Sequence, residues 1–176
     1  MYRKTTLYID IDDTIIAEVI PGSGRDLRPC VITHLTVLGQ LYDCCWLTSW
    51  PYSPADAPPS GMSVQTLMRA LYAHGINETF RYAHWDREHP DGKAGFILDS
   101  HQPHDWYWLE DPIPLGEHSA LTSAGKLDRY IPVAQHGPWG FLDAINEVFL
   151  RTGITRLDFD RIGARPEWFD RNTLLQ

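Results

Sequence analysis

The sequence has few cysteines, a shortage of basic residues and no long apolar run. Its 176 residues include only Cys30, Cys44 and Cys45. Adjacent strand residues point to opposite faces of a sheet, so these cysteines fit neither a disulfide framework nor a zinc site. No apolar segment approaches the roughly 20 residues of a membrane-spanning helix. The polar start before Leu7 leaves no room for a signal peptide. We therefore expect a cytoplasmic protein with reduced cysteines in its core.

Acidic residues outnumber basic ones, 23 to 15, which gives a net charge of −8. This balance disfavours non-specific binding to nucleic acid, where Lys and Arg supply most of the affinity. An apolar content of 43% is typical of a globular domain. We expect a single domain over residues 1–176, with its core at about 5–150. A polar tail, 154–176, would then pack on this core through Trp168 and Phe169.

The segment from Leu7 to Ile16 has the most informative pattern. An apolar run typical of a buried parallel strand ends in Asp10, Asp12 and Asp13, followed by Thr14. Clustered carboxylates repel one another, so they need a cation or shifted pKa values. Asp and Thr are also good residues for capping a helix. By itself this segment fits a metal site and a helix cap equally well.

Apolar runs with strand-like and helix-like patterns alternate along the chain. The predicted strands are 5–10, 44–47, 79–83, 106–109 and 129–134. The predicted helices are 30–42, 61–75, 93–101 and 141–150, with a hairpin or flap at 15–28 and loops at 51–61 and 112–127. This alternation predicts a three-layer α/β/α sandwich with a Rossmann-like, mostly parallel five-stranded sheet. Pro132 favours an edge position for the last strand.

Three predicted strands end in residues that can do chemistry: Asp10 and Asp12, Thr48 and Ser49, and Glu110 and Asp111. In a doubly wound sheet such strand ends lie together, which favours a functional site over a helix cap. Carboxylates from two strands provide the incomplete oxygen shell that suits Mg²⁺. The Thr48 hydroxyl and the Lys93 ammonium could then neutralise a phosphoryl group.

Leu7-Tyr8-Ile9-Asp10-Ile11-Asp12-Asp13-Thr14 resembles the first motif of the haloacid dehalogenase (HAD) superfamily, an apolar strand followed by Asp-x-Asp-x-Thr/Val. The resemblance implies a HAD-like fold in which Asp10 is the nucleophile towards phosphorus. Asp12 would be the general acid and base, and its backbone carbonyl would join Asp10 as a Mg²⁺ ligand.

Three further segments resemble the other HAD motifs in the same order. Cys44 to Thr48 resembles the second, which implies that Thr48, with Ser49 beside it, binds the phosphoryl group. Lys93 is the best-placed lysine for the third motif, although Arg81, Arg87 and Lys126 are other cations in the region. Glu110-Asp111 resembles the fourth, where the family usually has Asp-Asp, so either residue could be the metal ligand.

The resemblance implies a Mg²⁺-dependent phosphomonoester hydrolase that forms an aspartyl-phosphate intermediate on a phosphorylated substrate. The insertions between motifs are short, which implies a minimally capped, open site. In this family such a site acts on macromolecules or is covered by a partner chain or a second copy. Two alternatives stay open, a nucleotide or polynucleotide end phosphatase in repair and a non-catalytic phosphate-binding module. The segments 46–50 and 137–142 weakly resemble HAD domains of nucleic-acid repair proteins.

Aromatic and acidic residues near the strand ends also have simpler interpretations. We expect Trp46, Trp106 and Trp108 to pack in the core. Trp50 and Trp85 fall in loops near the site, where stacking against a base is the alternative to packing. Asp13 is expected to brace the acidic turn.

Overall fold

The computed structural model describes residues 4–18, 25–57, 61–73, 80–100, 105–137 and 139–164. Three features predicted from the sequence lie outside these ranges. They are the tip of the flap (19–24), the helix end at Gly75, and the Trp168–Phe169 anchor of the tail.

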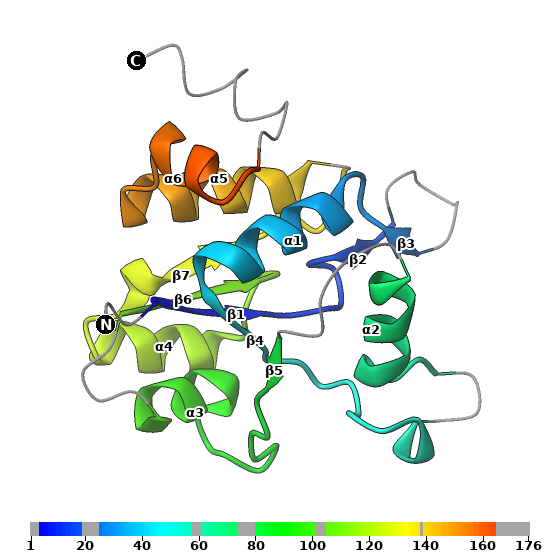
Figure 1. The fold of residues 1–176 in the computed structure, drawn as a ribbon. Coiled ribbons are helices and arrows are strands. Elements are labelled where there is room, and N and C mark those ends of the chain that lie inside the picture. Colours follow the sequence, from blue (N-terminus) through cyan, green and yellow to red (C-terminus); the bar gives the residue numbers. More distant parts are fainter. Residues whose placement is uncertain are drawn as a thin grey trace.

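A five-stranded parallel sheet forms the centre of the molecule (Figure 1). Its order is β5-β4-β1-β6-β7. The strands are β1 (Thr6–Ile9), β4 (Asp43–Trp46), β5 (Arg81–Tyr82), β6 (Trp106–Glu110) and β7 (Tyr130–Pro132). The order confirms that the strand with Pro132 lies at an edge. All residues of β1 and β6 are buried, as expected for central strands covered on both faces.

Helices cover both faces of the sheet, which confirms the three-layer α/β/α fold. Figure 1 shows α1 (Val31–Leu41), α5 (Gly140–Thr152) and α6 (Arg156–Arg161) on one face. The other face carries α3 (Gly92–Ser100) and α4 (Leu115–Ser123). No helix in the described part of the chain is both long and apolar enough to cross a membrane.

Neighbouring strand residues contribute to two separate apolar cores. Leu7 and Cys44 belong to the core beneath α1 and α5, whereas Tyr8 and Cys45 belong to the core beneath α3 and α4. Cys44 and Cys45 are buried free thiols on opposite faces, as predicted. The prediction was wrong for Cys30, which is exposed just before α1.

A hairpin and a helix lie beyond the carboxyl ends of the strands (Figure 1). The predicted flap is an antiparallel pair, β2 (Ile16–Ala17) and β3 (Asp26–Leu27). Helix α2 (Val64–Tyr72) starts at Ser63, whose hydroxyl accepts a hydrogen bond from the backbone N–H of Thr66. Such an N-cap satisfies one of the free N–H groups at the helix start. A 3₁₀ turn, η1 (Pro54–Asp56), interrupts the predicted loop at 51–61.

The prediction of a loop at 112–127 was wrong, because this segment contains α4 and the start of the 3₁₀ turn η2 (Leu127–Arg129). Leu121 is the one buried residue of α4, so the helix lacks the apolar periodicity on which the prediction relied. The described part of the tail, residues 154–164, packs on the core. Its first part forms α6, which is anchored by the buried Phe159.

Arg28 is a buried arginine that the sequence did not single out. Its side chain is 2% exposed and donates hydrogen bonds to the backbone carbonyls of Asp13 (2.7 Å), Ala134 (2.6 Å) and Gly137 (2.5 Å). These bonds join the base of the hairpin to the loop after β7. A side chain at Gly140 would place Cβ 2.5 Å from the Ala134 oxygen and 3.1 Å from Arg28 Nη1. Glycine is therefore needed there for this close approach.

His34 in α1 makes the fold sensitive to acid. It is 1% exposed, and its burial lowers the pKa of the imidazole to about 4. The unfolded chain, with a pKa near 6.5, takes up the proton first. The free energy of unfolding should therefore fall as the pH drops from about 6.5 to about 4, by on the order of 3 kcal/mol. We expect His34→Gln to lose much of this pH dependence. Urea unfolding at pH 7.0 and 4.5 would test it, and an unchanged pH dependence would contradict it.

Candidate active site

The three strands with reactive ends are neighbours at the centre of the sheet. Ile9 of β1 is in register with Trp46 of β4 and with Leu109 of β6. The N–H of Asp10 donates to the Leu109 carbonyl (3.0 Å), and the N–H of Leu47 donates to the Ile9 carbonyl (3.0 Å). The residues after these strands are thus held at one level, as the sequence predicted.

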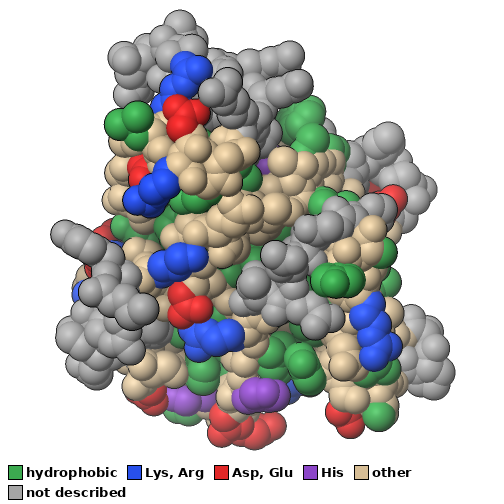
Figure 2. Space-filling view, viewed as in Figure 1, with side chains coloured by type: hydrophobic (Ala, Val, Ile, Leu, Met, Phe, Trp, Pro, Cys, Tyr) green, Lys and Arg blue, Asp and Glu red, His purple; other side chains and the backbone are tan. Residues whose placement is uncertain are grey.

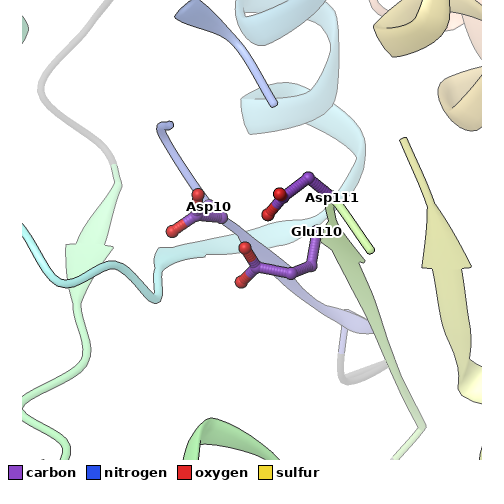
Figure 3. A group of neighbouring side chains, drawn as sticks. All are labelled: Asp10, Glu110 and Asp111. Carbon is purple, nitrogen blue, oxygen red and sulfur yellow. The ribbon is translucent and has the colours of Figure 1, made fainter. Parts of the chain in front are cut away.

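Three carboxylates converge beyond β1 and β6 (Figure 3). Asp10, Glu110 and Asp111 each offer an oxygen within 4.8 Å of the others. Burial raises the pKa of Asp10. Burial and then the charge of Asp10 raise the pKa of Glu110 well above its usual value. Such a buried, oxygen-only cluster can hold a hard cation, because added positive charge relieves the repulsion between the carboxylates.

Lys93 at the start of α3 provides positive charge at this cluster. Its Nζ lies 2.8 Å from Asp10 Oδ1 and 2.6 Å from Glu110 Oε2. Burial by itself would lower the pKa of Lys93, but the two carboxylates outweigh it and raise the pKa to about 12. The alternative cations Lys126 and Arg81 lie elsewhere, exposed at η2 and paired with Asp43 respectively.

Glu117 and Gly92 position Lys93, and no pattern in the sequence pointed to either residue. The Glu117 carboxylate, on α4, accepts a hydrogen bond from the backbone N–H of Lys93 (3.1 Å). Gly92 has a φ of 56°, and a Cβ there would lie 2.2 Å from Glu117 Oε1. Only glycine combines this backbone conformation with such close contact. Because α4 was predicted as a loop, nothing in the sequence indicated that Glu117 faces the site.

Asp12 lies outside the carboxylate cluster. Its Oδ1 accepts a hydrogen bond from Arg25 Nη1 (3.0 Å), and its Oδ2 accepts one from the indole N–H of Trp50 (2.7 Å). Arg25 also pairs with Asp13 (2.5 Å), so Asp13 braces the acidic turn as expected. Trp50 therefore orients a carboxylate, a role that was not among its predicted interpretations. The chain thus separates Asp10 and Asp12 into two different environments.

Thr48 and Ser49 follow β4 and differ in exposure. Thr48 is 1% exposed, and its hydroxyl accepts a hydrogen bond from the N–H of Trp50 (3.2 Å). The indole N–H of Trp85 donates to the Thr48 carbonyl (2.9 Å), so Trp85 supports the loop. Ser49 is exposed, and its carbonyl accepts a hydrogen bond from Arg87.

Asp111 is held by contacts from β7 and the segment after it. Gln135 Nε2 donates to Asp111 Oδ2 (2.7 Å), and the Tyr130 hydroxyl donates to the Asp111 carbonyl (2.9 Å). No motif in the sequence pointed to Gln135, which lies 24 residues from Asp111. Its amide holds the carboxylate without neutralising it.

No protein-family model matches this chain, and no curated protein matches it significantly.

Replacing Lys93 by Met should destabilise the fold by about 3–5 kcal/mol, because it leaves two buried carboxylates without their cation. Arg81→Met is the matched control. Arg81 is paired with Asp43 near the surface, so its loss should cost less than about 1 kcal/mol. Urea unfolding at pH 7.5 would measure both. Equal effects would show that the buried Lys93 contacts contribute no more than an exposed ion pair.

Proposed function

We propose that the protein is a Mg²⁺-dependent phosphomonoester hydrolase that works through an aspartyl-phosphate on Asp10. The observation that carries the proposal is the cluster at Asp10. A buried carboxylate at the end of the central strand has a lysine Nζ at 2.8 Å, two further carboxylates within 4.8 Å and the Thr48 strand end beside it. This combination provides a nucleophile together with groups that bind a phosphoryl oxygen and a cation.

The two aspartates divide the reaction between them. Asp10 attacks phosphorus, the bond from phosphorus to the ester oxygen breaks, and Asp12 gives that oxygen its proton. Asp12 then takes a proton from a water molecule, whose oxygen attacks the aspartyl-phosphate. Inorganic phosphate leaves, and the Asp10 carboxylate is restored. General acid–base assistance of this kind typically contributes 10²–10⁴-fold to a rate.

Lys93 and Thr48 stabilise the charge on the transferring group. The Lys93 ammonium, which lies 2.8 Å from Asp10, and the buried Thr48 hydroxyl would contact its equatorial oxygens. Asp10, the Asp12 carbonyl and Asp111 would hold Mg²⁺, which when bound supplies positive charge to the phosphate oxygens. Asp10 and Glu110 share the Lys93 ammonium, whereas Asp111 forms no ion pair within the described residues. We therefore assign Asp111 rather than Glu110 as the second carboxylate ligand beside Asp10.

The same experiments would also test the two alternatives, a nucleotide or polynucleotide end phosphatase and a non-catalytic phosphate-binding module. On the face in Figure 2, basic and acidic side chains are interspersed and form no basic tract there. This distribution gives no support to a polynucleotide strand as the substrate on that face. Metal binding without turnover of any phosphate ester would instead support a non-catalytic phosphate-binding module.

Asp10→Asn should lower kcat with p-nitrophenyl phosphate and Mg²⁺ by on the order of 10⁴-fold or more, because the amide is not a nucleophile. Asp43→Asn is the control, since Asp43 is an acidic residue at the opposite, amino end of the neighbouring strand. Circular dichroism should show both variants folded. Wild-type turnover by folded Asp10→Asn would exclude the proposed mechanism.

Asp111→Asn should raise the Mg²⁺ concentration that gives half-maximal activity by about tenfold or more, whereas Glu110→Gln should change it less. The reason is that the Asp111 carboxylate forms no ion pair within the described residues, whereas Glu110 pairs with Lys93. Mg²⁺ titration of activity and calorimetry would compare the two. A larger loss of affinity in Glu110→Gln would reverse the assignment of the ligand.

A further inference from the structure

A pocket of about 720 Å³ opens beside Asp12, between the β2–β3 hairpin and α2. These two elements lie at the same end of the molecule in Figure 1. The volume falls within the range of about 300–1,000 Å³ that is usual for small-molecule sites. Much of its wall is apolar, from Ile16, Leu27, Trp50, Met62, Leu67 and Ala70.

The position of Asp12 relates this pocket to the proposed reaction. Asp12 lines the pocket, whereas Asp10, Glu110 and Asp111 do not. In the proposed mechanism the Asp12 carboxyl must reach the ester oxygen, so the group attached to that oxygen lies on the Asp12 side. The pocket is thus on the leaving-group side of the carboxylate cluster.

The charges in the wall limit what the pocket can bind. The wall contains three carboxylates and two guanidinium groups, from Asp12, Asp26 and Asp56 and from Arg25 and Arg87. Arg25 is already paired with Asp12 and with Asp13. The pocket therefore offers no excess of positive charge for a second phosphate or for a nucleic-acid strand. A neutral ligand with a large apolar surface suits these walls best.

We infer that this pocket binds the leaving group of the substrate, and that the substrate is a small phosphate monoester of an aromatic or comparably apolar alcohol. The inference rests on the proposed function. Apolar side chains bury the ring, and Asp12 lies where that ring's ester oxygen meets the phosphoryl site. Trp50 contributes twice, since it lines the pocket and its indole N–H holds Asp12 at 2.7 Å.

Ala70→Phe tests the pocket from an exposed position of α2. The added ring fills pocket space without replacing a core side chain. Ala73→Phe is the matched control, because Ala73 is exposed at the end of the same helix and does not line the pocket. We expect Ala70→Phe to lower kcat/KM for 1-naphthyl phosphate at least tenfold more than kcat/KM for glycerol 3-phosphate. Ala73→Phe should leave both values at the wild-type level.

Binding of 1-naphthol, measured by calorimetry, adds a result that needs no turnover. Wild type and Ala73→Phe should bind it, and Ala70→Phe should bind it at least tenfold more weakly. If phosphates are hydrolysed but Ala70→Phe and Ala73→Phe behave alike, the pocket assignment fails and the phosphatase stands. If no phosphate is hydrolysed while naphthol binding is lost only in Ala70→Phe, the proposed function fails and the aromatic pocket stands. Faster hydrolysis of an oligonucleotide end phosphate than of 1-naphthyl phosphate would overturn the substrate class.

Discussion

The contact on which the site depends is the ammonium of Lys93 between the buried carboxylates of Asp10 and Glu110. Burying these groups without the lysine would cost several kcal/mol for each charge. The need to keep Lys93 beside these carboxylates explains the contacts around it. Gly92 allows the tight approach of Glu117, and Glu117 holds the backbone at Lys93. The helix that carries Glu117 therefore contributes to the site although its own surface is largely exposed.

The two aspartates of the first motif are only two residues apart but lie in different surroundings. Asp10 faces buried charges, whereas Asp12 faces a pocket and is held by Arg25 and Trp50. In the proposed mechanism Asp10 is the nucleophile and Asp12 the proton donor, and these different surroundings would give the two carboxyl groups separate roles. Arg28 stabilises this arrangement, because its hydrogen bonds connect the base of the hairpin to the loop after β7. The hairpin can then provide both Arg25 and one wall of the pocket.

Local patterns were enough to predict most of the fold. Alternating strand and helix periods led to the parallel sheet, and Pro132 correctly indicated an edge strand. The failure at α4 has a physical cause, because a helix with one buried residue has no apolar face to detect. The error hid Glu117, whose role depends on that helix packing against α3. Cys30 was predicted to be in the core but is exposed, because burial depends on tertiary packing as well as on residue type.

By itself the sequence determined which residues follow the central strands, because strand periodicity and chain order place Asp10, Thr48 and Glu110 at strand ends. It could not decide what those residues contact. The sequence favoured Lys93 among the nearby cations, but only the tertiary structure showed its contacts with Asp10 and Glu110 and placed Asp12 in a pocket wall. These contacts join residues far apart in the chain, such as Lys93 with Asp10, 83 positions away. Contacts between residues so far apart in the chain depend on how the helices and strands pack, and a local sequence pattern does not contain that information.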